Sequence, residues 1–109
     1  MTDVIIASVG QTNVGEHWEL SLRDLAFQAV ETALKDAYGL FPQAIYVGNM
    51  LAPVISHQSH LGALIADYTG LGNLEAYTIE AGGASGGAAL RQAYLAITSG
   101  ALDVALVVG

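Results

Sequence analysis

The sequence contains no cysteine, so disulfide bridges, thiolate metal sites and a cysteine nucleophile are all excluded for the chain as written. It has only three basic residues, Arg23, Lys35 and Arg91, against ten acidic ones, which gives a formal charge of −7. Three widely spaced cations cannot displace the counterions of a nucleic acid, so that partner is excluded. They also disfavour a tight site for a phosphate-rich ligand built from this chain alone.

Long apolar runs are absent as well. Gly, Ser, Thr or a charge interrupts every apolar stretch before it reaches the roughly 18 residues that a membrane span needs. The opening residues, MTDVIIASVG, have no basic segment and carry an early acid, which is not the pattern of a signal peptide. We expect a cytoplasmic protein that does not enter a membrane.

The residues that are present favour a folded α/β protein. At 53% hydrophobic and 12% charged, the chain is too apolar to be disordered and should bury a core. The order of strand and helix patterns is β-α-β-α-β-α-β, which predicts a mostly parallel sheet with helices on its faces. The strands are predicted at 3–10, 44–50, 75–81 and 103–109, and the helices at 21–39, from about 59 to 70, and at 85–99.

Two of the predicted helices have distinctive patterns. The helix at 21–39 has an apolar stripe, a capping-box pair in Ser21 and Asp24, and Gly39 where it should end. The helix at 85–99 is apolar on nearly every side, which predicts burial on nearly every side. Four strands cannot surround such a helix, so we expect residues 1–109 to be an incomplete domain.

Histidines and acidic residues suggest two sites, neither of which is well supported. The loop GQTNVGEH at 10–17 mimics a phosphate-binding loop, but Glu16 stands where lysine belongs and would repel phosphate. His57 and His60 could face one metal ion, yet no third ligand is suggested nearby. Loop histidines that are solvated or that cap the following helix are the favoured interpretation, and no metal site is predicted.

The turn AGGASGG at 81–87 leads from a strand into a helix and offers one reactive side chain. GASGG fits the G-x-S-x-G pattern of a nucleophile elbow, with Ser85 as the nucleophile. That architecture expects an acid and then a histidine after the serine, whereas His17, His57 and His60 all precede it. The turn could also hold an anion with backbone N–H groups, which is a weak signal by itself.

Four stretches resemble the N-terminal region of thiolases: SLRDLAFQAVETAL, AIYVGNML, HLGALIADYTGL and, above all, EAGGASGGAALRQAYLAITSGALDVALVVG. The similarity covers essentially all 109 residues and points to the archaeal and bacterial acetyl-CoA acetyltransferase branch, near the sterol-carrier-protein thiolases. The resemblance implies one half of a layered α/β subunit, in which a second half covers the helix at 85–99. The family's catalytic histidine, oxyanion-hole asparagine, second cysteine and most of its coenzyme A loop belong to regions that this chain does not include.

The nucleophile position departs from the family pattern. In thiolases the turn typically reads E-A-x-C-A-S-G, and matching it to Glu80, Ala81, Ala84, Ser85 and Gly86 puts the acyl-accepting cysteine at Gly83. A thiol there would feel the positive end of the helix dipole, which favours thiolate. Gly83 has no side chain, so the chain is expected to be inactive as given.

The resemblance also implies a substrate and partners. The parent protein would condense or cleave acyl-CoA thioesters, with coenzyme A as part of the substrate and no separate cofactor. A homodimer is expected, with the strand EAYTIEA at 75–81 at the subunit contact. The alternatives are a non-catalytic thiolase-like protein that binds acyl-CoA or a subunit, and a thiolase-like lyase that uses another residue.

Overall fold

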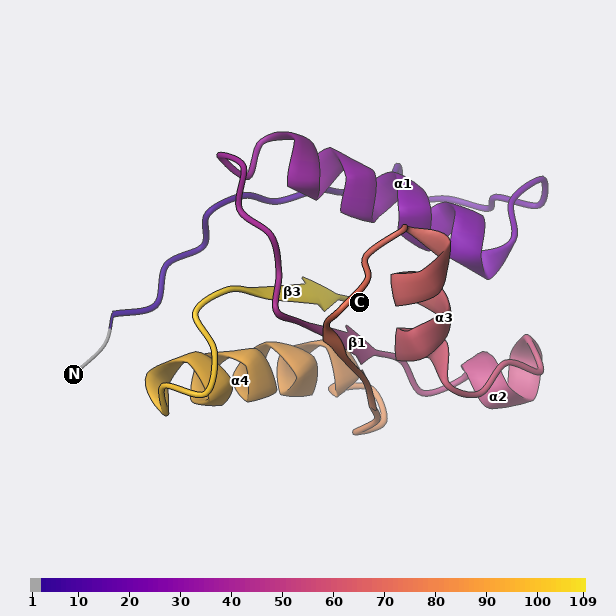
Figure 1. The fold of residues 1–109 in the computed structure, drawn as a ribbon. Coiled ribbons are helices and arrows are strands. Elements are labelled where there is room, and N and C mark those ends of the chain that lie inside the picture. The colour runs from indigo at the N-terminus through magenta and orange to yellow at the C-terminus, as the bar shows by residue number, and fades with distance from the viewer. Residues whose placement is uncertain (1–2) are drawn as a thin grey trace.

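The computed structural model describes residues 3–109, which form a three-layered α/β arrangement (Figure 1). The central layer is a three-stranded parallel sheet in the order β2-β1-β3. Helices α1 and α3 cover one face and α4 covers the other. The elements are α1 (Leu22–Lys35), β1 (Ala44–Gly48), α2 (Ala52–Ile55), α3 (Leu61–Tyr68), β2 (Glu75–Ile79), α4 (Ser85–Thr98) and β3 (Ala105–Val108).

The central strand β1 is buried along its whole length because it has a neighbour on both edges and a helix layer on both faces. Its side chains alternate between two cores. Ile45 and Val47 pack with α1 and α3, whereas Ala44 and Tyr46 pack with α4. The continuous apolar sequence of β1 is therefore that of a parallel strand covered on both faces.

Helix α1 has the N-terminus that the sequence predicts. Ser21 accepts a hydrogen bond from the backbone N–H of Asp24, and the Asp24 carboxylate accepts one from the backbone N–H of Ser21. This capping box satisfies two donors at the start of the helix. The helix ends at Lys35, short of the predicted boundary at Gly39.

The prediction of a strand at 3–10 is wrong. The segment is extended but has no place in the sheet, because both edges of β1 are occupied by β2 and β3. It lies beside α1 instead, where the Ser8 hydroxyl donates to the carbonyl of Ala33 over 2.7 Å. Ile5 and Ile6 are 80% and 76% exposed, so the apolar side chains of this segment are not buried against the sheet.

The prediction that the helix at 85–99 is buried on nearly every side is also wrong for the described residues. Ser85, Ala89 and Ala93 face the sheet, but Leu90 and Tyr94 are half exposed. The reason is that α4 has a packing partner on one side only, which is the sheet (Figure 1). The short helix α2 lies where the sequence indicated a loop. The Asn49 side chain, two residues before its N-cap Leu51, accepts hydrogen bonds from the N–H groups of Leu51 and Ala52.

Candidate functional site

The candidate site lies at the carboxyl edge of the sheet, where β1, β2 and β3 end around the first turn of α4. This edge is where parallel α/β sheets usually bind ligands. The backbone N–H of Asn49, just after β1, donates to the carbonyl of Ile79 at the end of β2 over 3.1 Å. Gly109, just after β3, approaches Gly86 in α4.

Gly48 brings β1 against the start of α4. A Cβ added at Gly48 would lie 2.4 Å from the carbonyl oxygen of Ser85 and 2.8 Å from the backbone nitrogen of Gly86. Only glycine permits two backbones to approach this closely. Sequence reasoning overlooked this residue, although a glycine that ends a buried strand is a recognised signal of close backbone approach.

Ser85 holds the turn together. Its hydroxyl accepts from the N–H of Ala81 over 2.9 Å and donates to the carbonyl of Gly82 over 2.7 Å. The side chain is 5% exposed, and its hydroxyl proton is already engaged. Ser85 therefore has a structural role, and the nucleophile elbow interpretation does not fit the geometry.

Gly82 completes the turn through its backbone. Its φ of +58° lies in the left-handed region, which glycine adopts at low cost. Its N–H donates to the Glu80 carboxylate over 2.5 Å. The Glu80 and Ser85 side chains thus fix the backbone on both sides of Gly82 and aim residue 83 outward.

Gly83 differs from Gly48 and Gly82 because nothing in the structure requires a glycine there. Its backbone is outside the left-handed region, and an added Cβ would have no heavy atom within 4 Å. The position is exposed, two residues before α4 begins. A side chain at 83 would fit without displacing its neighbours.

The N-terminus of α4 is left uncapped. No side chain hydrogen-bonds to it, its N-cap is Ala84, and its first turn contains no acid. The first N–H groups of a helix carry a partial positive charge and favour an anion. The geometry would therefore stabilise a negative charge on an atom attached at position 83.

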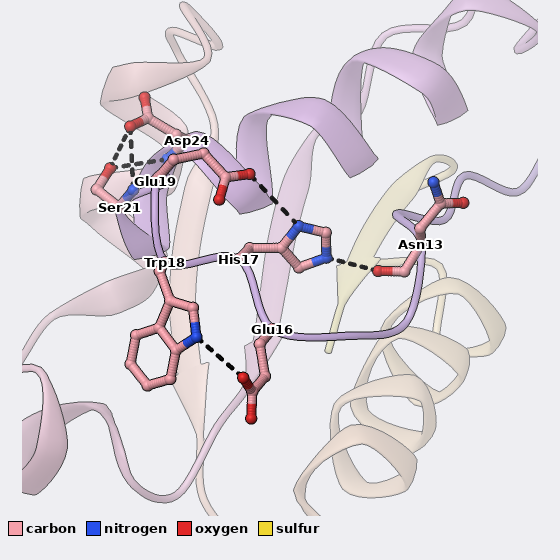
Figure 2. Close-up of polar contacts among 7 residues, drawn as sticks. All are labelled: Asn13, Glu16, His17, Trp18, Glu19, Ser21 and Asp24. Atoms are coloured by element: carbon pink, nitrogen blue, oxygen red, sulfur yellow. Dashed lines mark hydrogen bonds and ion pairs between the residues drawn. The ribbon is translucent and has the colours of Figure 1, made fainter.

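The histidine-containing loop before α1 is a separate, structural cluster (Figure 2). His17 Nε2 lies 2.6 Å from the carbonyl oxygen of Asn13, and its Nδ1 lies 4.0 Å from Glu19. Glu16 accepts from the indole N–H of Trp18 over 2.9 Å. These contacts brace the loop.

The other two histidines do not form a site with it. His57 and His60 are exposed, and His60 precedes α3 without a capping bond from its side chain, so of the two interpretations solvation holds and capping does not. Within residues 3–109, no three histidine or acidic side chains gather closely enough to hold a metal ion. None of the helices described there is long and apolar enough to cross a membrane.

Comparison with known proteins shows the family of this chain. A family model described as "Thiolase, N-terminal domain" matches residues 4–109. The chain belongs to the thiolase family. It is 41% identical over 111 aligned residues to an acetyl-CoA acetyltransferase of Methanothermobacter thermautotrophicus and 45% identical to one of Methanocaldococcus jannaschii. All of the chain is aligned, but it spans only 29% and 28% of the lengths of these two acetyltransferases.

Proposed function

We propose that this chain is the N-terminal part of a thiolase-type acyltransferase that acts on acyl-CoA thioesters, and that it is inactive with glycine at position 83. The observation that carries the proposal is the geometry of Gly83. It is exposed, free of steric demand and next to the uncapped N-terminus of α4. A cysteine thiolate at this position would be stabilised by the helix and could accept an acyl group.

We assign the other two catalytic roles, the base and the oxyanion donors, to residues outside this chain. Acyl transfer through a thioester needs a base to deprotonate the thiol and donors for the oxyanion. Ser85 is engaged within the turn, and the histidines of this chain belong to other loops. We therefore expect no thiolysis from residues 1–109 alone, and none from the Gly83→Cys variant of the same chain.

A chimera tests the proposal most sharply. This chain would replace the aligned N-terminal segment of the Methanothermobacter acetyl-CoA acetyltransferase, with glycine, alanine or cysteine at position 83. We expect acetoacetyl-CoA thiolysis only from the cysteine chimera, because only cysteine supplies the acyl acceptor. Activity with glycine, or a folded cysteine chimera without activity, would contradict the proposal.

A non-catalytic thiolase-like protein is the second candidate, favoured by the missing side chain at Gly83. Such a protein would bind acyl-CoA or a subunit through the same scaffold. Calorimetric titration of the glycine chimera with acetyl-CoA separates the two. Binding without turnover, together with a cysteine chimera that stays inactive, would favour this second candidate.

We also infer that the complete protein is a homodimer that pairs along β2. The support is that β2 forms an open edge of the sheet and that Tyr77 on it is 42% exposed and stacked on Tyr46, with ring centroids 5.3 Å apart. An open edge with an exposed aromatic residue is suited to pairing with a second copy. Sedimentation of the complete protein tests this, and a monomer at micromolar concentration would contradict it.

A further inference from the structure

The turn between β2 and α4 is held by two side chains, and only one of them is charged at neutral pH. Ser85 is buried, and its hydroxyl bonds to the N–H of Ala81 and the carbonyl of Gly82. Glu80 is exposed, and its carboxylate accepts from the N–H of Gly82 over 2.5 Å. The serine therefore fixes the turn from inside the fold, whereas Glu80 fixes it from the solvent side and brings a negative charge to it.

The contact between Glu80 and Gly82 restrains the backbone immediately before position 83. Among residues 3–109, the Glu80 carboxylate is the acceptor that the structure shows for the Gly82 N–H. Glycine restricts its own φ and ψ less than any other residue, so the φ of +58° at Gly82 depends on such contacts. Losing the carboxylate would therefore loosen the direction in which residue 83 points.

Few other charges lie around this turn in the part of the chain that the structure describes. Helix α4 contains one charged residue, Arg91, which lies well over a turn beyond its start. β2 carries Glu75 at its first residue, about 16 Å from Glu80 along an extended chain at roughly 3.3 Å per residue. Gly48 and Gly109, which approach the first turn of α4 from β1 and β3, are uncharged. The Glu80 carboxylate is thus the charge that acts on position 83 at short range.

The helix and the carboxylate act on a thiolate at position 83 in opposite directions. The first N–H groups of α4 stabilise the thiolate. The carboxylate binds the N–H of the adjacent residue, which by covalent geometry puts it roughly 6–9 Å from a sulfur atom at position 83. A negative charge at this separation, in a partly solvated site, raises the pKa of a thiol by about 0.5–1 unit.

We propose that Glu80 is a positioning residue for the acyl acceptor at position 83, and that its charge offsets part of the stabilisation that α4 gives to the thiolate. This inference rests on the proposed function, because it concerns the group that accepts the acyl chain. Its two parts are separable by substitution. Glutamine keeps an acceptor oxygen for the Gly82 N–H but has no charge, whereas alanine has neither.

The offset suits a sulfur atom that must first attack and later leave. In acyl transfer the sulfur at position 83 bonds to the acyl carbon as the bond from that carbon to the coenzyme A sulfur breaks, and the thiol proton passes to coenzyme A. The nucleophilicity of a thiolate falls as its pKa falls, so the helix acting unopposed would weaken the attack. Glu80 holds the thiol in a range where enough thiolate forms and that thiolate stays reactive.

The pH dependence of alkylation tests the role of the charge. Glu80→Gln is introduced into the Gly83→Cys variant, and the matched control is Glu75→Gln in the same variant, which removes an equal charge from the far end of β2. We expect Glu80→Gln to lower the pKa of the thiol by about 0.5–1 unit and Glu75→Gln to lower it by less than about 0.2. At about 1 M salt the effect of Glu80→Gln should shrink by at least about half, because the Debye length falls to about 3 Å.

An unchanged pKa with Glu80→Gln, or an equal shift with Glu75→Gln, would overturn the inference. This outcome differs from a failure of the proposed function. That failure appears before Glu80 is changed, as a thiol at position 83 with the same pKa as one introduced by Gly72→Cys.

Amide hydrogen exchange tests the positioning role in the chain with glycine at position 83. We expect Glu80→Ala to speed exchange of the Gly82 amide about tenfold, whereas Glu80→Gln should keep it within about twofold of the original chain. The Ala81 amide, which the Ser85 hydroxyl holds, is the internal reference and should not change. Equal exchange of the Gly82 amide in all three chains would overturn the positioning role.

Discussion

Two glycines near the carboxyl edge of the sheet differ in how much free space surrounds them. Gly48 is required, because a Cβ there would overlap the backbone of Ser85. Gly83 is not required, because a Cβ there would meet nothing. The sequence alone does not separate them, since each stands at or shortly after the end of a strand. Only the path of α4 past β1 shows the difference.

Crowded and open glycines should respond differently to alanine, and the predicted changes in the free energy of unfolding have opposite signs at Gly48 and Gly87. Gly48→Ala should lower the free energy of unfolding by about 2–3 kcal/mol, because backbone must move to admit the methyl group. Gly87→Ala, in open space within α4, should raise it by about 0.5–1 kcal/mol through helix propensity. Urea unfolding followed by circular dichroism measures both. A neutral Gly48→Ala would contradict the close packing of β1 and α4.

Ser85 supports a prediction that distinguishes a structural serine from a nucleophile. Ser85→Ala removes the partner of the Ala81 N–H and should cost about 1–3 kcal/mol of stability. In the cysteine chimera, the same substitution should raise KM or lower kcat only modestly, since the hydroxyl does not attack. Ester hydrolysis by the original chain that disappears in Ser85→Ala would contradict this role.

At the scale of elements, α1 and α3 are joined by an exposed polar and aromatic contact. The Tyr68 hydroxyl donates to the Asp24 carboxylate over 2.5 Å, which links α3 to the capping box of α1. The Arg23 guanidinium lies 5.4 Å from the Tyr68 ring centroid, and Phe27 meets that ring edge-on. Hydrogen bonds from Ser21 and Tyr68 lower the pKa of Asp24 below its usual 3.8.

The lowered pKa gives a pH dependence with a definite sign. Because the folded-state pKa of Asp24 lies below the unfolded one, its stabilisation is present above about pH 4 and is lost as the pH falls through the folded-state value. Asp24→Asn should therefore flatten the fall in melting temperature between roughly pH 4 and pH 2. Tyr68→Phe should flatten it in part. An unchanged acid profile in Asp24→Asn would contradict the contact.

The elements also show which sequence patterns are sufficient to predict where a helix or a segment lies. The start of α1 could be predicted at Ser21 because a capping box is local, and its partners are three residues apart. The position of the segment at 3–10 could not be predicted, because a short apolar run does not specify which element lies beside it. The half-exposed α4 has the same cause. The apolar composition of α4 indicates that it needs apolar surfaces on several sides, and residues 3–109 supply only one such surface, the sheet.

At the scale of the whole molecule, the parallel sheet could be predicted from the sequence. The assignment of the nucleophile position to residue 83 stays a prediction from the resemblance, and the structure adds that the surroundings of Gly83 admit a side chain. The roles of Gly48, Glu80 and Asn49 were missed, because each depends on contacts with backbone atoms that the sequence pattern does not show. The chain spans under a third of the length of the two acetyl-CoA acetyltransferases.

The exposed face of α4 leads to a prediction for the isolated chain. Changing Leu90 and Tyr94 to Gln should reduce self-association and dye binding without lowering stability by more than about 0.5 kcal/mol, because neither side chain is in the core. Light scattering and thermal melts test this. A large loss of stability would show that this face is packed within the chain.

Cysteine introduced at position 83 allows the most direct measurement of the central claim, that residues 81–85 form a turn suited to a thiolate. The control is Gly72→Cys, at a loop glycine that also has open space around it. The pH dependence of alkylation gives the pKa of each thiol. We predict a value near the ordinary 8.5 or so for position 72 and at least about one unit lower for position 83. Equal pKa values at the two positions would contradict the claim.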